Sequence, residues 1–523
     1  MSKFSHLIIV ALIVIAGAIH TPAQQRENGA SVSPLVRLLQ SKGIITDQEA
    51  ARISDASSAP QADRQLAELL LSKGVITREE YAQTLVALGA SSTASGQPAA
   101  PVMSTAARVI PAPAEPVRPA TEAAAKPSSA AQAQPQGDVT TQSKLPVKIY
   151  GNILLNTTYG SHGSNTIDIP LFAQKRTVSA DQNHQNFTAT LRASRFGLRY
   201  ENKIFDDAKL TGVFEFDLFG GKPAFANGID SDIFRLRLAY GRIDWKKNSL
   251  EAGQDWAVFS PLNPTSLSGY GIPAFSTSGN LWNRIPQIRF EHREGDKSKF
   301  IFTTALLDPN AGDSVGNPAA RVIGLGERGS LPAFEARIGF TTPAHGKETS
   351  AGVSGHYSRL LGEPGNPAGT TVRSPFDSYG VSGDANLWIT SGLRFTGEVF
   401  HGRALGIFSG NIAQSTIVIG GRARGINSTG GWIELHGEAP AGYQGTLKNF
   451  SVNTGYGVED NREQDLIVGA RERNQTFLVN GQYKFSPNFT FALEYRHVLT
   501  DWFREPLSNQ RLNWAGMSFL YSF

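Results

Sequence analysis

Residues 209–218 read KLTGVFEFDL, a stretch in which apolar and polar side chains alternate with a period of two. Successive side chains of a β-strand point to opposite faces of the sheet, so this stretch predicts a strand with two different faces. By this parity Phe214 belongs to an apolar face, while Val213 lies on a second face that also carries the charges of Glu215 and Asp217. We therefore expect a sheet with one face against an apolar medium and the other open to water.

The same alternation recurs from Val147 to the end of the chain. It appears again at residues 234–238, 334–338, 379–389, 477–485 and 489–496. Short turns are expected near residues 202–206, 246–248, 295–297, 343–347, 390–391 and 486–488, with a somewhat longer connection near 437–445. Longer loops are expected at residues 160–186, 258–283, 308–332 and 402–425. Counted this way, the segment holds about sixteen strands, an even number that leaves both ends on one side.

A soluble β-sandwich also alternates, but three features favour a closed barrel. Full charges lie at mid-strand, where a water-filled lumen tolerates them and a packed core does not. Long and short connections alternate, and the chain ends in FLYSF, with aromatic residues at Phe519, Tyr521 and Phe523. Because an open sheet edge is too costly in lipid, the sheet must close. The sequence therefore predicts an all-β fold, a transmembrane antiparallel β-barrel over residues 145–523.

The first 23 residues carry the pattern of an export signal. Lys3 precedes the apolar run LIIVALIVIAGAI at residues 7–19, and the small residues of Thr21-Pro22-Ala23 follow it. A run of this length is too short to span about 30 Å of hydrocarbon, which favours a cleaved signal peptide at residues 1–23 over a membrane anchor.

Residues 24–90 contain an internal repeat that predicts a short α-helical segment. LLQSKGIIT at residues 38–46 recurs as LLLSKGVIT at residues 69–77, and each copy is typical of a helix that ends at Lys-Gly. Thr46 with Glu49, and Thr77 with Glu80, form capping boxes for the helices that follow. The segment is either a hairpin that packs on itself or a module for oligomerisation or envelope tethering.

Residues 91–144 differ in composition from both neighbouring segments. They are mostly Ala, Pro, Ser, Thr and Gln. Such a stretch has too few large apolar residues to offset the entropy of ordering, so we interpret it as a linker.

Several motifs resemble those of bacterial outer-membrane porins. The alternating aromatics with a terminal Phe resemble the signal that the barrel-assembly machinery reads, and SRFGLR at residues 194–199 looks like the early-strand motif of trimeric general porins. RLRLAY at 235–240, GQDW at 253–256 and RIPQIR at 284–289 follow the order found in DcaP-like porins. The N-terminal repeat is more similar to the short helices of some phosphate-selective porin O/P barrels than to the coiled coil of DcaP-like proteins.

The resemblance implies a homotrimer in which the loop at residues 258–283 folds into the lumen and narrows it. This loop contains no charged residue, so any charge selectivity must come from the wall.

The candidate functional residues are charged side chains that the parity places in the lumen. They are Arg192, Arg195, Arg235, Arg237, Arg289, Arg337, Glu215, Asp217, Asp384, Glu398, Glu434 and Glu494. Arginines do not all fall in the first half of the barrel or carboxylates in the second, since Glu215, Asp217, Glu335, Arg394 and Arg496 break this division. One hypothesis is that these charges merely hydrate and pair across the wall. The other is a transverse field that orients dipolar solutes and favours anions. Arginine suits carboxylate and phosphate groups because its planar fork binds two oxygens.

The composition and motifs argue against other classes of protein. The chain has no cysteine, which excludes disulfides and Cys-ligated metal sites, and it lacks the repeated apolar runs of a helical membrane bundle. A net charge of +4 without a dense basic run gives no sign of nucleic-acid binding. GLGERG at residues 324–329 matches a dinucleotide motif, but Pro332 and a strand follow it, so a loop is expected. We expect no catalysis and no cofactor.

The sequence thus predicts a porin in the bacterial outer membrane, in contact with its lipid, with residues 24–90 in the periplasm. Its expected function is passive diffusion of small hydrophilic solutes, with a modest preference for anions. Two alternatives stay open, namely a selective channel for dicarboxylates or phosphate, and a structural envelope tether.

Overall fold

The computed structural model describes residues 45–54, 59–73, 139–140, 146–166, 168–175, 184–204, 208–221, 232–310, 323–362 and 372–523. The expected signal peptide, the second expected capping box (Thr77 with Glu80) and nearly all of the expected linker lie outside the described residues. The chain divides into two units between residues 106 and 107, and each is described by itself.

The N-terminal unit contains two helices, α3 (Asp47–Ser54) and α4 (Ala59–Ser72). The predicted capping box opens α3, because the Glu49 carboxylate accepts a hydrogen bond from the backbone N–H of Thr46 at 2.7 Å. Glu49 also pairs with Lys73 at 2.8 Å, which links the start of α3 to the end of α4. The buried apolar residues of the pair are Ile45, Ala50, Ile53, Leu66, Ala67 and Leu70. Within the described part of the chain, no helix is both long and apolar enough to cross a membrane.

This helix pair should respond to acid through Glu49. The hydrogen bond from Lys73, followed by the one from Thr46, lowers the pKa of Glu49 from 4.5 to about 2. Its contribution to stability is therefore present above pH 4.5 and is lost as the pH falls through about 2. Amide hydrogen exchange of residues 45–54, corrected for intrinsic rates, should show protection that weakens over this range. The loss should be small because the pair is exposed. Glu49→Gln should abolish the pH response, and an equal response in that variant would contradict the assignment.

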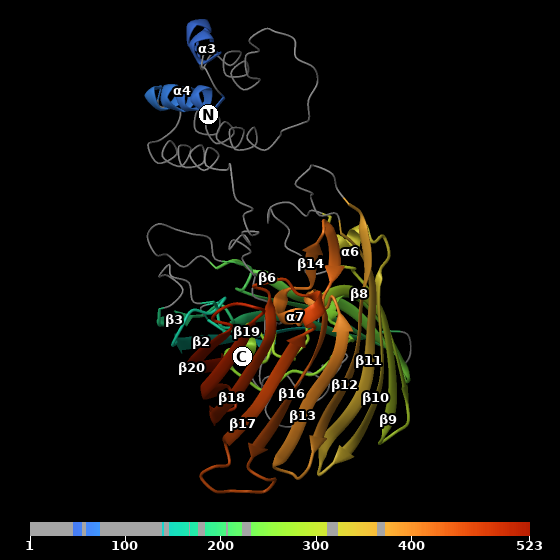
Figure 1. The fold of residues 1–523 in the computed structure, drawn as a ribbon. Helices are drawn as coiled ribbons and strands as arrows, with labels where there is room; N and C mark the ends of the chain where they lie inside the picture. Colours follow the sequence, from blue (N-terminus) through green and yellow to red (C-terminus); the bar gives the residue numbers. More distant parts are fainter. Residues whose placement is uncertain are drawn as a thin grey trace. The chain divides into compact units, whose positions relative to one another are not determined.

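The second unit is a closed antiparallel barrel of sixteen wall strands (Figure 1). The first half of the wall consists of β2 (Val147–Gly160), β3 (Asn186–Thr190) with β4 (Arg195–Ile204), β5 (Ala208–Asp217), β6 (Arg235–Asp244), β7 (Asn248–Trp256), β8 (Arg284–Glu294), β9 (Lys299–Leu307) and β10 (Ala333–Ala344). The second half consists of β11 (Lys347–Gly362), β12 (Ser374–Trp388), β13 (Leu393–Arg403), β16 (Asn427–Glu438), β17 (Phe450–Asn461), β18 (Arg471–Ser486), β19 (Phe489–Trp502) and β20 (Asn509–Ser522).

β3 and β4 together occupy one of the sixteen places in the wall, because both pair with β2. Three further strands lie outside these sixteen places. The two-residue strand β1 (Val139–Thr140) pairs with the start of β2. β14 (Thr416–Ile419) and β15 (Arg422–Gly425) form a separate hairpin within the connection from β13 to β16.

The barrel closes between its first and last strands. β2 pairs with β20 from Asn152 opposite Ser522 to Gly160 opposite Trp514. Gly151 and Phe523 extend this seam, since the N–H of each donates to the carbonyl oxygen of the other at 3.1 and 3.0 Å. The terminal aromatic residues thus lie in the closing seam of the barrel.

The connections alternate in length around most of the wall, but the eleven residues between β16 and β17 outnumber the six between β19 and β20. Short turns join β4 to β5, β6 to β7, β8 to β9, β10 to β11, β12 to β13 and β18 to β19, and a longer one joins β16 to β17. The long loops lie at the opposite end, where Figure 1 shows the β14 hairpin and α6 (Leu325–Arg328). The motif at residues 324–329 falls on α6, a four-residue helix after which β10 begins.

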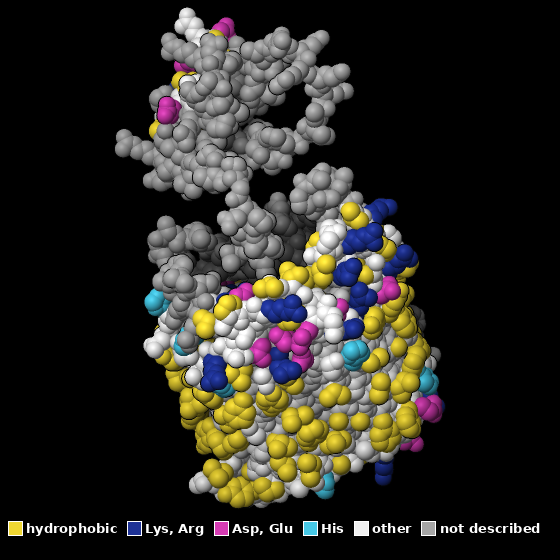
Figure 2. Space-filling view, viewed as in Figure 1, with side chains coloured by type: hydrophobic (Ala, Val, Ile, Leu, Met, Phe, Trp, Pro, Cys, Tyr) yellow, Lys and Arg dark blue, Asp and Glu magenta, His cyan; other side chains and the backbone are white. Residues whose placement is uncertain are grey.

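The two faces of the wall follow the predicted parity. On β5, Phe214 is 48% exposed, whereas Val213, Glu215 and Asp217 are buried. Hydrophobic side chains cover the lower part of the outer face in Figure 2, and charged ones gather above them. The inner face differs from the expected water-filled lumen, because its mid-height side chains lie beneath loops that fold inward.

An arginine placed on the outer face should destabilise the barrel according to depth. Phe214→Arg at mid-strand should cost about 2–4 kcal/mol, while Phe300→Arg, near a short turn, should cost about 0–1 kcal/mol. Both positions are exposed on the outer face, at 48% and 63%, which makes them a matched pair. Reversible denaturant unfolding in detergent micelles would measure the difference in the free energy of unfolding. Equal costs would show that the depths of these two positions in the membrane are wrongly assigned.

Candidate functional site

The loop from β7 to β8 lies inside the barrel. Its residues 257–283 are almost all buried, including Phe259, Tyr270 and Leu281, which are fully shielded from solvent. A short 3-10 helix, η2 (Ser268–Tyr270), lies in its middle. The two ends of the loop meet where the N–H of Ala257 donates to the carbonyl of Asn283 at 3.0 Å.

Glutamates on the inner wall hold the first half of this loop. Glu335 on β10 accepts hydrogen bonds from the backbone N–H groups of Val258 and Phe259 at 2.7 and 3.0 Å. Glu398 on β13 accepts from the Ser260 hydroxyl at 2.8 Å.

Two more glutamates continue the series. Glu434 on β16 accepts from the N–H of Thr265 at 2.7 Å. Glu494 on β19 accepts from the hydroxyls of Ser266 and Ser268, both at 2.6 Å. Because backbone N–H groups and serine hydroxyls need acceptors when buried, these carboxylates explain how an uncharged loop is fixed to the wall.

The second half of the loop packs against a stretch of wall that has few side chains. A Cβ on Gly279 would lie 2.1 Å from the carbonyl oxygen of Gly431, so loop and wall meet backbone to backbone. Beside this contact the Phe275 ring stacks on Trp432 at 6.0 Å. Phe275 itself holds a positive φ of 60°, which costs energy and is kept by its surroundings.

A second segment, residues 404–415, also folds inward. Its 3-10 helix η3 (Gly406–Phe408) and the short turn α7 (Gly410–Ala413) are largely buried. The backbone N–H of Asn411 donates to Glu459 on β17 at 2.5 Å. Arg471 on β18 donates to the carbonyls of Ile412 and Ala413 at 2.6 and 2.9 Å. This segment lies against the first loop, because the N–H of Trp282 donates to the Phe408 carbonyl at 3.1 Å.

Four of the predicted arginines gather on the wall formed by β3 to β6 and the turn before β4. Arg237 pairs with Glu215 at 2.5 Å and with Asp217 at 3.2 Å. Arg235 pairs with Asp217 at 2.6 Å, so the predicted carboxylates of β5 belong to this cluster. Arg192 pairs with Asp168, a partner that lies in the loop after β2.

Arg195 connects this cluster to the inward loop. Its Nη2 donates to the carbonyl oxygen of Tyr270 at 3.0 Å, and its guanidinium lies 4.6 Å from the centre of the Tyr270 ring. The loop therefore reaches both the glutamate wall and the arginine wall.

The remaining predicted arginines lie apart from this cluster. Arg289 on β8 pairs with Asp255 at 3.3 Å and with Glu251 at 3.7 Å. Arg337 on β10 pairs with Asp384 on β12 at 2.6 Å. Glu434 pairs with Arg394 at 3.3 Å and Glu494 with Arg496 at 2.7 Å. The twelve predicted charges are thus all on the inner face, but they belong to several separate groups rather than to one ring.

Sequence reasoning missed several parts of this interior. Glu459 and Arg471 were not singled out, nor was the segment at residues 404–415 that they hold. Its sequence, ALGIFSGNIAQS, is free of charge and carries Leu405, Ile407 and Phe408. A loop that faces water is expected to be polar, so this apolar, uncharged stretch could have indicated that the segment folds inward.

No protein-family model matches the sequence, and no curated protein matches it. Among solved structures, the chain is similar to the outer-membrane channel DcaP of Acinetobacter baumannii, with a TM-score of 0.54 and 17% identity over 73% of this chain and 99% of that one. An anion-selective porin from Comamonas acidovorans has a TM-score of 0.44 and 12% identity, over 72% and 99% of the two chains. OprB of Pseudomonas putida has a TM-score of 0.44 and 9% identity, over 72% and 94%. The barrel, its closing seam and its likeness to DcaP together show that this chain has the fold of the outer-membrane porins.

Proposed function

We propose that the protein is a passive diffusion channel for small hydrophilic solutes in the bacterial outer membrane, with a modest preference for anions. The observation that carries this proposal is the uncharged loop at residues 258–283, fixed inside a closed barrel. Such a loop narrows the lumen without adding charge, so the potential in the passage comes from the wall.

The anion preference follows from how the wall charges are used. Glu335, Glu398, Glu434 and Glu494 bind the loop and lie behind it, away from the passage we propose. The cluster around Arg195 holds four arginines and three carboxylates, which are Arg192, Arg195, Arg235, Arg237, Asp168, Glu215 and Asp217. An excess of one positive charge in a low-dielectric constriction supports a modest preference rather than strict selectivity.

Neutralising Arg195 and Arg235 together should move the reversal potential in a salt gradient toward cation preference. Asp217 keeps Arg237 as a partner in this variant, and heat-modifiable gel mobility shows whether the barrel still folds without the bond from Arg195 to the Tyr270 carbonyl. Replacing Arg237 instead would leave Glu215 buried without this ion pair, at a cost of about 3–5 kcal/mol. The measurement is single-channel recording of the Arg195→Gln/Arg235→Gln variant in planar bilayers.

The control for this experiment is Arg359→Gln, which removes an exposed arginine from β11 and should leave the potential unchanged. High salt should weaken the effect, since the Debye length falls to about 3 Å at 1 M. If the double variant keeps the wild-type reversal potential at low salt, these arginines have a structural role only.

We further propose that the chain forms a homotrimer and is inserted by the barrel-assembly machinery through Phe519, Tyr521 and Phe523. The start of β2 and the end of β20 share the short-turn end of the wall, which supports a periplasmic location for the N-terminal segment. Protease treatment of intact cells should leave that segment uncut, and cross-linking of purified protein should stop at three chains.

A selective channel for dicarboxylates or phosphate is the second candidate, and the inward segment at residues 404–415 favours it. Two inward segments narrow the lumen more than one, and arginine forks bind carboxylates and phosphates with two hydrogen bonds. Succinate or phosphate should then block the chloride current in a saturable way, whereas uncharged sugars of similar size should not. A linear, unsaturated effect favours plain diffusion.

A further inference from the structure

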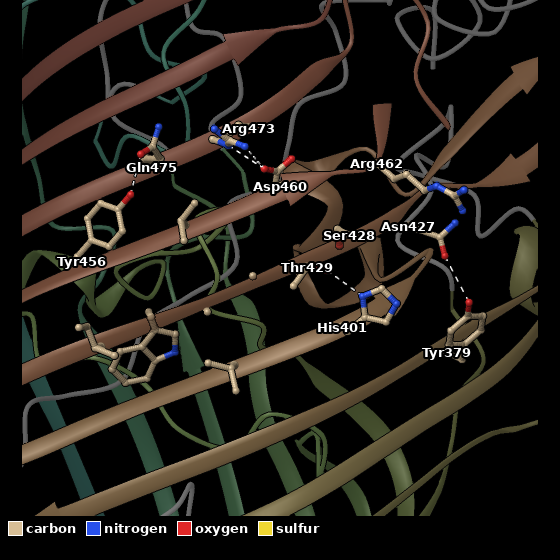
Figure 3. A pocket seen from close by; sticks show the side chains of 16 residues that line it. Tyr379, His401, Asn427, Ser428, Thr429, Tyr456, Asp460, Arg462, Arg473 and Gln475 are labelled. Atoms are coloured by element: carbon tan, nitrogen blue, oxygen red, sulfur yellow. Dashed lines mark hydrogen bonds and ion pairs between the residues drawn. The ribbon is translucent and has the colours of Figure 1, made fainter. Parts of the chain in front are cut away.

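A recess of about 1030 Å³ opens in the outer face of the barrel wall, across β12, β13, β16, β17 and β18 (Figure 3). The volume lies at the upper end of the range of about 300–1,000 Å³ found for small-molecule sites. The recess opens on the outer face, because its lining includes outward-facing residues such as Val399 and Ile433, which are 64% and 50% exposed, and it reaches down to the buried Trp432.

The floor of the recess exists because the wall lacks side chains at this point. Gly431 stands opposite Val399 on one neighbouring strand and opposite Val458 on the other. A Cβ on Gly431 would lie 2.5 Å from the carbonyl oxygen of Glu398, so the strands approach too closely for any larger residue. Valine, isoleucine and tyrosine side chains flank the bare backbone, which gives the lower part of the recess an apolar surface.

The upper rim is polar and carries both signs of charge. His401, Thr429, Asp460 and Arg473 stand opposite one another on consecutive strands and form one row. Arg473 donates from Nε to Asp460 at 2.8 Å, and His401 is 2.8 Å from the Thr429 hydroxyl. Arg462 adds a second guanidinium to the rim (Figure 3). The row continues to Asp501 on β19, which stands opposite Arg473.

We propose that this recess binds one zwitterionic phospholipid, with an acyl chain on the apolar floor and the headgroup on the mixed rim. Arg462 and Arg473 each bring to the rim a guanidinium group, whose paired donors suit a phosphate. The carboxylate of Asp460 in the rim, with that of Asp501 beyond the recess on the next strand, matches an ammonium group beside that phosphate. A purely anionic headgroup fits less well, because these carboxylates would repel it.

The occupant follows from where the recess lies. Its lining runs from apolar residues such as Val399 and Ile433 to the charged Asp460 and Arg473, which is the boundary that a lipid molecule itself spans. A protein partner would need complementary strands or side chains, and nothing in the recess selects for those.

The test counts lipids that remain bound to the full-length protein. The protein is exposed to micelles containing phosphatidylethanolamine and phosphatidylglycerol with identical acyl chains, in equal amounts, and is analysed by native mass spectrometry. Wild-type protein should retain one phosphatidylethanolamine per chain in preference to phosphatidylglycerol. Arg462→Gln/Arg473→Gln should lower this retention about tenfold, the effect of losing a hydrogen bond to a charged group.

Two further variants separate the headgroup from the recess. Thr429→Trp should fill the recess and abolish retention, while Arg511→Gln, at an exposed position on β20, should change nothing. Heat-modifiable gel mobility shows that each variant is folded. The pair of Arg473 and Asp460 is exposed, so its loss should not unfold the barrel.

Three outcomes would overturn the proposal. Phosphatidylglycerol retained equally well would reject the zwitterionic headgroup, and unchanged retention in Thr429→Trp would reject the recess. Disulfide cross-linking between copies of a Val399→Cys variant, in a chain without other cysteines, would show that a second copy covers this face instead.

Discussion

Replacing residues 259–281 with a short Gly-Ser connection should raise the conductance and reverse the preference from anions to cations. The loop lies inside the barrel, and its removal uncovers Glu335 and Glu398, whose carboxylates now accept backbone N–H groups of the loop. Glu434 and Glu494 keep their ion pairs with Arg394 and Arg496. A cation 4 Å from an uncovered carboxylate gains about 4 kcal/mol at an effective dielectric constant of 20, which exceeds any modest preference from a single excess arginine. The ends of the loop are hydrogen-bonded to each other, so the short connection should close without moving the strands.

Single-channel recording in a salt gradient measures both effects. The control replaces Glu335 and Glu398 with glutamine in the shortened protein, which should keep the high conductance and lose the cation preference. A shortened protein with wild-type conductance would show that the loop is not the narrowing element.

Removing residues 519–523 should prevent the barrel from closing and leave little or no folded protein in the outer membrane. This truncation deletes four of the nine register pairs between β2 and β20, together with the reciprocal bonds of Gly151 and Phe523. The freed backbone groups would face hydrocarbon, where each unsatisfied group costs several kcal/mol. Heat-modifiable mobility of outer-membrane fractions measures the folded fraction.

A milder change separates the side chain of Phe523 from its backbone. Phe523→Ala keeps both backbone hydrogen bonds and should slow insertion rather than prevent it, whereas Phe523→Tyr keeps the ring and should insert normally. Normal levels of folded truncated protein would mean that the terminal strand is not needed for closure.

Much of the barrel could be predicted from sequence because period-two alternation is a local property. The stretch around Phe214 has its apolar face outward as the pattern required, and the turns at residues 246–248 and 486–488 separate consecutive strands. Parity also placed Glu215 and Arg237 on the inner face without any knowledge of the sheet.

The pairing inside the barrel could not be predicted, because it depends on which strands face one another. Arg337 finds Asp384 two strands away, and Arg192 finds Asp168 in a loop. Alternation gives no information on register between strands. The inner charges were expected to face water, whereas Arg237 and Arg337 are buried against carboxylates that the register brings to them.

The anchors of the inward loop also impose an order on folding. Along the loop, Val258, Ser260, Thr265 and Ser266 bind glutamates that lie 77, 138, 169 and 228 residues further along the chain. Each successive contact therefore closes a longer stretch of polypeptide, and closing longer stretches is slower. The loop can dock only stepwise, as β10, β13, β16 and β19 come into place. Its last contact forms on the strand next to the closing seam, so docking of the loop and closure of the barrel should complete together as one late, slow kinetic phase.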